Sequence, residues 1–129
     1  MRTLTAFLCL TFAVLLFSAG VSWSADFQKG ITAYDSEDYA TALREWTPLA
    51  KQGYADAQNA LVFLYGNGKG VLQDYIRAYM WWNIAASSGD SKSASKNSDI
   101  VAKRMNSNQI ETAQKLAQEC IAKNTFTGN

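Results

Sequence analysis

The sequence contains no histidine, and its 129 residues include only two cysteines and one proline. Histidine is the usual general base and metal ligand of proteins, and it activates the nucleophile in Ser-His and Cys-His pairs. Its absence excludes those catalytic arrangements and the commonest metal sites. Cys9 lies in an N-terminal segment that we expect to be removed, so Cys120 has no partner for an internal disulfide. The composition therefore indicates no catalytic residue, no metal site and no cofactor.

The N-terminal segment has the pattern of a secretory signal peptide. A positive start at Met1-Arg2 precedes an apolar run of 14 residues from Leu4 to Phe17, and small residues follow at Ser22 and Ser24. We expect residues 1–24 to be cleaved near Ser24 or Ala25. The run is shorter than the ~20 residues that span a bilayer, although counting on to Trp23 leaves an uncleaved anchor as the alternative.

The charge balance argues against two classes of partner. Without Arg2 the mature chain carries 11 basic and 11 acidic residues, and the basic ones are scattered along it. A neutral chain without a basic patch is not expected to bind nucleic acid, or to attach to a membrane by charge after signal cleavage.

A sixteen-residue motif occurs twice, 36 positions apart. Six of its positions are identical in the two copies: Asp38, Tyr39, Ala42, Trp46, Ala50 and Gly53 recur as Asp74, Tyr75, Ala78, Trp82, Ala86 and Gly89. A period of this length is typical of stacked helix pairs, in which each pair buries its apolar face against the next. Such arrays usually bind partners and seldom catalyse reactions.

The apolar spacing is helical along the rest of the mature chain, with no strand-like alternation. It predicts helices over residues 26–34, 39–51, 55–65, 75–88, 93–105 and from Ser107 or Asn108 to 123, with a frayed tail at 124–129. Asp38 and Asp74 are the expected N-caps of two of them. Residues 25–123 then form one domain, with units at 26–53 and 54–89 and a helical cap at 91–123.

The last helix has one apolar and one wet face, as expected of a terminal cap. Its wet face holds Glu111, Lys115, Gln118 and Glu119, and its apolar face holds Ile110, Ala113, Leu116, Ala117, Cys120 and Ile121. Whether Cys120 is buried or pairs with another chain is left open.

Residues 57–89 resemble the Sel1-like repeat family, a relative of the tetratricopeptide repeat. The resemblance rests on fourteen positions in register: Ala57-Gln58, Leu61, Tyr65, Gly68, Gly70-Val71, Asp74, Ala78, Trp81-Trp82, Ala85-Ala86 and Gly89. It implies an all-α fold, a short α/α solenoid of about two units plus the C-terminal cap. It also implies a concave face that binds a protein or peptide, and no catalytic residue. Together with the signal peptide, it leads us to expect a small bacterial protein, periplasmic or secreted and monomeric.

The first helix of each pair lines the concave face in such a solenoid, which makes Gln28, Asn59 and Phe63 candidate binding residues. In the second helix of the second pair, Tyr75, Ala78, Trp82, Ala85 and Gly89 form a stripe that we expect in the core. Trp81 lies beside this stripe, so we expect it to be partly exposed and add it to the binding candidates.

Two other patterns resemble a phosphate site and a catalytic site in part. The loop Gly66–Gly70 lacks the first glycine and the hydroxyl of a phosphate-binding loop, with Phe63 and Gly70 in those places. The acidic cluster Asp35, Glu37 and Asp38 lies in a wet turn, where a raised pKa is not expected. A carboxylate-dependent envelope hydrolase and a signal-anchored envelope scaffold remain as alternative functions.

Overall fold

The computed structural model describes residues 25–89 and 95–123, which form helices and no strand. The helices are α2 (Phe27–Asp35), α3 (Tyr39–Lys51), α4 (Ala55–Asn67), α5 (Tyr75–Ser87), α6 (Ser95–Ala102) and α7 (Ser107–Ala122). The all-α prediction is confirmed. The predicted signal peptide, the predicted tail and the start of the predicted helix 93–105 lie outside the described residues.

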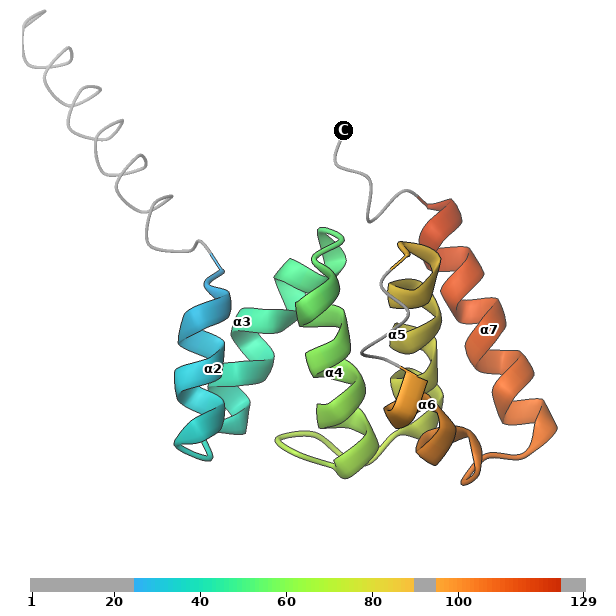
Figure 1. Ribbon diagram of the computed structural model, residues 1–129, viewed down its shortest axis with the longest axis horizontal. Coiled ribbons are helices and arrows are strands. Elements are labelled where there is room, and N and C mark those ends of the chain that lie inside the picture. The colour runs from blue at the N-terminus through green and yellow to red at the C-terminus, as the bar shows by residue number, and fades with distance from the viewer. Residues whose placement is uncertain (1–24, 90–94, 124–129) are drawn as a thin grey trace, which may run out of the picture.

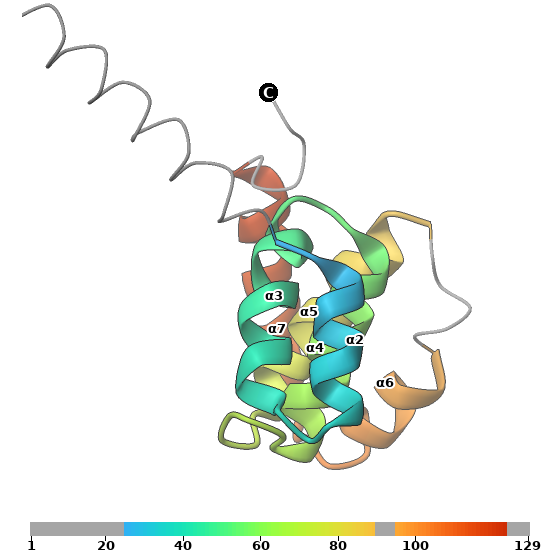
Figure 2. The same ribbon diagram turned by 90° about the vertical axis from the view of Figure 1, so that its left-hand side faces the viewer.

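The helices stack as consecutive pairs into a short solenoid (Figure 1). Helix α3 packs between α2 and α4, and α5 packs on α4 on one side and on α6 and α7 on the other. Seen from the α2 end, α2 and α6 lie on one side of the stack and α3 and α7 on the other, with α4 and α5 between them (Figure 2). Helix α6 also contacts α4, so the first helices of the second and third pairs meet directly.

Aspartate side chains start three of the helices. Asp26, Asp38 and Asp74 each accept hydrogen bonds from backbone N–H groups of the first turn that follows. These N–H groups have no partner within the helix, so an acceptor at the N-cap stabilises each start. The predicted caps at Asp38 and Asp74 are confirmed.

The predicted cap of the last helix was wrong by one or two residues. Asn106, and not Ser107 or Asn108, caps α7, because its side chain accepts from the Gln109 N–H while the Gln109 side chain accepts from the Asn106 N–H. This reciprocal capping box satisfies two backbone donors at once, which a cap one residue later cannot do with Gln109. The preceding helix ends at Ala102, three residues before its predicted end.

Left-handed glycines end three helices. Gly53, with φ 94°, follows α3, and Gly89, with φ 91°, follows α5. Helix α4 runs to Asn67, two residues beyond the predicted Tyr65, because the glycine that ends it is Gly68, with φ 66°. Gly66 is therefore inside the helix. A positive φ suits glycine, which lacks the Cβ that makes this conformation costly for other residues.

The core is built mainly from alanines at the places where helices meet. Six of them are fully buried: Ala42, Ala50, Ala57, Ala78, Ala85 and Ala113. Larger side chains, Leu61, Leu64 and Ile84, fill the space between the helices at 0–1% exposure. Small residues at the contacts let the backbones approach closely, and the larger ones maintain the density of a protein interior.

Trp46 joins the first two helices. Its indole is 5% exposed, and its Nε1–H donates to the carbonyl oxygen of Phe27 at 3.1 Å. The ring lies over Gly30 of α2, where an added Cβ would stand 2.2 Å from Nε1. The absence of a side chain at Gly30 therefore leaves room for the indole. The hydrogen bond from Trp46 to Phe27 attaches the start of α2 to α3.

The structure corrects the predicted positions of Trp81 and Trp82. Trp81 is 7% exposed and belongs to the core together with Ala78, Ile84 and Ala85, whereas Trp82 is half-buried and packs against the core from its edge. The prediction assumed that α5 buries the same motif positions as α3, which equates Trp82 with the buried Trp46. Because α5 packs on α6 and α7 as well as α4, its buried sector is centred one residue earlier.

The terminal helix α7 follows its predicted faces in part. Ala113 and Ala117 are buried and the predicted wet residues are exposed, but Leu116 and Ile121 are 36% and 42% exposed at the margin of the apolar face. Cys120 is half-buried and packs against the core.

Truncating the two adjacent tryptophans tests this packing. We expect Trp81→Ala to lower the free energy of unfolding by about 3–5 kcal/mol, as for other large buried aromatics. Trp82→Ala should cost clearly less, since its ring is half-exposed and its buried Nε1–H has no acceptor among the described residues. Urea denaturation of both variants measures the difference, and a larger loss for Trp82→Ala contradicts the observed helical phase.

Two helical glycines provide a matched pair of substitutions. Gly30→Ala forces a methyl group into the buried Trp46 indole, and overpacking of this kind costs about 1–3 kcal/mol. Gly66→Ala places its methyl 3.4 Å from Val101 Cγ2, an ordinary contact, and gains up to about 1 kcal/mol of helix propensity. The midpoint temperature of thermal unfolding should therefore fall for Gly30→Ala and rise for Gly66→Ala. Equal effects argue against the close approach of α2 and Trp46.

Candidate docking surface

Phe63 stands between two hollows on α4, the first helix of the second pair. Its side chain is 37% exposed, and its ring centroid lies 5.9 Å from that of Tyr34 on α2. The first hollow, of about 240 Å³, is lined by Tyr34, Trp46, Ala60 and Phe63. It therefore joins α2, α3 and α4 through three aromatic rings and one methyl group, with no charged side chain.

The second hollow, of about 220 Å³, lies on the other side of Phe63 and joins α4 to α6 and the start of α5. Its lining combines apolar and polar residues and consists of Val62, Phe63, Gly66, Asn67, Gln73, Tyr75, Ile100, Val101 and Arg104. Arg104 is the charged member. We call these two hollows, with the ring between them, the Phe63 surface.

Asn59 lies one helical turn before Phe63, and residues four apart share one face of a helix. Its side chain is half-buried, and its Oδ1 is shielded from solvent without a hydrogen-bond partner among the described residues. A buried acceptor without a donor is costly, so a small local rearrangement that supplies a donor would be favourable.

The four predicted binding residues are placed differently by the structure. Asn59 and Phe63 share one face of α4. Gln28 is exposed at the start of α2, and neither Gln28 nor Asn59 lines either hollow beside Phe63. Trp81 is buried, so the expectation that it offers an exposed ring was wrong, for the reason given above.

The sequence did not identify Tyr34, Trp46, Ala60 and Arg104 as parts of this surface. Tyr34 recurs as Tyr65 in the second unit, which signals a repeat position but not an exposed one. Trp46 is almost fully buried, and only the rim of its ring reaches the hollow. Tyr34, Trp46 and Ala60 come from three different helices and Arg104 from the turn after α6, so only their assembly in space defines the site.

A third hollow does not include Phe63 but adjoins the second hollow, with which it shares Gln73 and Tyr75, where the loop before α5 meets the starts of α5 and α7. It has a volume of about 610 Å³, and its lining includes Leu72, which is 92% exposed, together with Tyr65, Ile76 and Gln109. This region is the natural comparison for the Phe63 surface, because it also exposes an apolar side chain.

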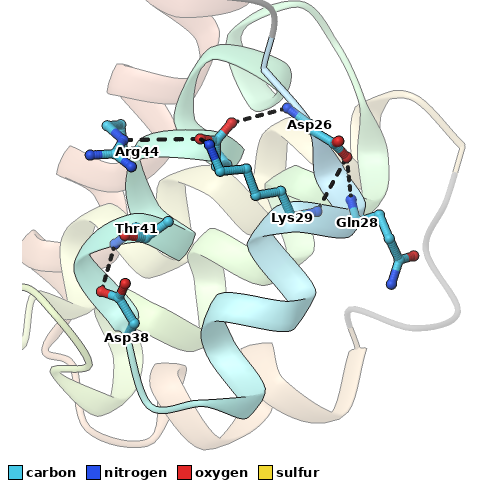
Figure 3. Close-up of polar contacts among 7 residues, drawn as sticks. Asp26, Gln28, Lys29, Asp38, Thr41 and Arg44 are labelled. Atoms are coloured by element: carbon cyan, nitrogen blue, oxygen red, sulfur yellow. Dashed lines mark hydrogen bonds and ion pairs between the residues drawn. The ribbon is translucent and has the colours of Figure 1, made fainter.

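The carboxylates of the acidic cluster lie at the start of α3, where one of them serves as a helix cap. Asp35, Glu37 and Asp38 are exposed, and Asp38 accepts the Thr41 N–H at 3.2 Å (Figure 3). The hydrogen bonds to Thr41, with a smaller contribution from Arg44, lower the pKa of Asp38. A general acid needs a raised pKa, so this carboxylate is shifted in the wrong direction for that role.

Glu45 is a carboxylate of a different kind. It is 8% exposed, and it accepts the backbone N–H of Asp26 at 3.1 Å through Oε2. Its Oε1 lies 3.1 Å from Lys29 Nζ and 4.0 Å from Arg44 Nε. The Asp26 hydrogen bond and then Lys29 lower the pKa of Glu45. Glu45 therefore links α3 to the first residues of the domain.

Within residues 25–89 and 95–123, no three cysteine, aspartate or glutamate side chains gather as a metal-binding group. Over the same residues, no helix combines the length and the apolar character needed to cross a bilayer.

Comparison with known proteins adds one informative similarity. No family model matches the chain. The structure is similar to the crystal structure of c5321, a protective antigen present in uropathogenic Escherichia coli strains displaying an SLR fold. The two share 27% sequence identity with a TM-score of 0.65 over 75% of this chain, which spans 22% of the length of that protein.

The SLR fold is that of the Sel1-like repeat, which the motif at residues 57–89 resembles. The helix pairs, the repeated capping aspartates and this structural similarity lead to one conclusion: the chain is a short all-α solenoid of the Sel1-like repeat fold.

Proposed function

We propose that this protein is an exported interaction module that docks a peptide or protein partner on the side where α2, α4 and α6 come together. Helical repeat folds are typical of interaction modules, since stacked helices offer an extended surface. The observation that carries the proposal is the Phe63 surface, where a half-exposed aromatic ring separates two hollows formed by three successive helix layers.

The size of the hollows favours side chains over small molecules as occupants. Sites for drug-sized ligands enclose about 300–1,000 Å³, and the hollows on the two sides of Phe63 enclose about 240 and 220 Å³. Each fits a single bulky apolar side chain of a partner. Burying one such side chain contributes about 1.5–3 kcal/mol, so two along one extended segment contribute about 3–6 kcal/mol toward the cost of association, and contacts along the rest of the segment supply the remainder.

The lining also suggests how a partner is oriented. The first hollow has no charged group, while Arg104 stands at the second. An apolar side chain in the first hollow and an acidic or carbonyl group near Arg104 would set the direction of the bound segment. We place this docking in the periplasm or outside the cell, with a monomeric protein.

The hydrolase alternative has less support. Glycoside hydrolysis uses two carboxyl groups about 5–9.5 Å apart on the two sides of a bound sugar. Neither hollow beside Phe63 has an aspartate or glutamate in its lining. The lining of the third hollow contains one carboxylate, that of Asp74, which caps α5. The anchored-scaffold alternative differs only in whether the leader is retained.

Binding measurements on matched variants test the proposal. A peptide selected from a displayed random library against the processed protein is titrated by calorimetry. Phe63→Ala should weaken its affinity at least tenfold, as expected for an aromatic hot spot, and Asn59→Ala should weaken it less. Leu72→Ala is the control, because it removes an even more exposed apolar side chain that lines neither of the two hollows beside Phe63.

The acidic cluster serves as a second control. Joint replacement of Asp35, Glu37 and Asp38 by alanine should leave affinity unchanged, apart from the stability lost with the Asp38 cap. Helicity by circular dichroism must match the wild type in every variant. Two results would contradict the proposed function. One is a peptide affinity that is unchanged by Phe63→Ala but falls with Leu72→Ala, and the other is a substrate turnover that is lost when the acidic cluster is replaced.

A further inference from the structure

The start of the domain is held to α3 by two neighbouring side chains. Glu45 accepts the Asp26 N–H at 3.1 Å, and Trp46 donates to the Phe27 carbonyl oxygen at 3.1 Å. Asp26 itself caps α2 by accepting from Gln28 and Lys29. The position of Asp26 is therefore fixed by contacts from α3 and from its own helix.

The Glu45 carboxylate has unused capacity on one oxygen. Oε1 faces Lys29 and Arg44, whereas the Asp26 N–H is the hydrogen bond that Oε2 accepts among the described residues. A carboxylate oxygen offers two lone pairs, so Oε2 can accept a second donor. Because Glu45 is 8% exposed, a donor from the chain itself can reach it more readily than bulk water.

The predicted processing site lies immediately before this fixed point. Small residues at Ser22 and Ser24 fit the two positions that a signal peptidase reads, which places cleavage at the Ser24–Ala25 bond. Hydrolysis of that bond consumes one water molecule. It leaves a carboxylate on Ser24 of the leader and a new amine on Ala25. With an ordinary pKa of about 7.7–8.0, this amine is largely protonated at neutral pH.

We infer that Glu45 is the binding site for the α-ammonium group that processing creates. The inference rests on the export part of the proposed function. The Ala25 nitrogen precedes the Asp26 nitrogen by one residue, at most about 3.6 Å. It therefore lies no more than about 7 Å from Glu45 Oε2, given the 3.1 Å hydrogen bond. Before cleavage the same nitrogen is a neutral amide.

The charged groups around the new terminus act in opposing directions. Glu45 on α3 and Asp26 at the start of α2 attract an ammonium group, while Lys29 on α2 and Arg44 on α3 repel it. Lys29 and Arg44 are 58% and 69% exposed, whereas the Glu45 side chain is 10% exposed. Water screens the two cations more than the buried carboxylate, so the attraction to Glu45 prevails.

This contact would make processing part of folding. The ion pair exists only in the cleaved chain and adds to the attachment of α2 to α3. Since α2 supplies Tyr34 and α3 supplies Trp46, it also supports the first hollow of the Phe63 surface.

The test titrates the new amine in the processed protein. The full chain is expressed in an exporting host, its N-terminus is sequenced, and the pKa of the α-amine is obtained from the pH dependence of its acetylation by acetic anhydride. We expect a chain that begins at Ala25. Glu45→Gln should lower the pKa of that amine by about half a unit or more, which is a threefold loss of proton affinity.

Glu119→Gln is the control, because it removes an exposed carboxylate on α7 and should leave the amine unchanged. Should Glu45→Gln fail to fold, the wild-type protein is titrated with and without urea, and the pKa must fall by the same half unit on unfolding. An amine indifferent to Glu45 overturns this inference and leaves export intact. A processed chain that begins at neither Ala25 nor Asp26 also overturns it, and an unprocessed chain overturns export itself.

Discussion

The packing of the Trp46 indole over Gly30 is the contact on which the rest of the structure depends. It fixes the distance between α2 and α3, and the hydrogen bond from Nε1 to Phe27 fixes their relative position along the axis. Helix α2 has nine residues, too few to be stable alone, so this attachment accounts for its presence. The same indole then forms a wall of the hollow beside Phe63. One side chain thus serves the core and the candidate site together.

Alanine contacts explain how the surface is kept open. Where alanines meet, the helices approach closely and leave no room for side chains to rearrange, so the relative positions of α3, α4 and α5 are well defined. Aromatic side chains are then placed at the periphery of this frame, where they cover the core on one side and line hollows on the other. A surface built in this way is preorganised, and a partner loses little free energy in ordering it.

Much of the fold could be predicted from the sequence because its signals are local. The aspartate caps and the glycine after α3 each act within a few residues, and the motif repeats them at a fixed spacing. The placement of Asn59 and Phe63 on one face of α4 followed from their spacing on the first helix of a pair, whereas their role in binding stays a prediction. The end of α4 was missed because two glycines, Gly66 and Gly68, compete for it, and only the second is in the left-handed conformation.

The remaining features depend on neighbours that no single helix reveals. The repeat alignment equates Trp81 with Glu45, and both positions are buried, although one is apolar and the other charged. A charged residue on an amphipathic helix is expected on the wet face. Glu45 departs from this because its Oε2 accepts a hydrogen bond from the backbone N–H of Asp26, 19 residues away in the sequence. The hollows likewise combine side chains from three helices, and their shape emerges only when the layers stack.

Site-specific photo-crosslinking in the exporting host tests the central claim most directly. A photoreactive amino acid is placed at Phe63, and at Lys115 on the exposed face of α7 as the comparison. Docking on the side formed by α2, α4 and α6 predicts a covalent adduct with a discrete partner from position 63 and none from position 115. Adducts from position 115 alone, or equal capture from both positions, would contradict the account.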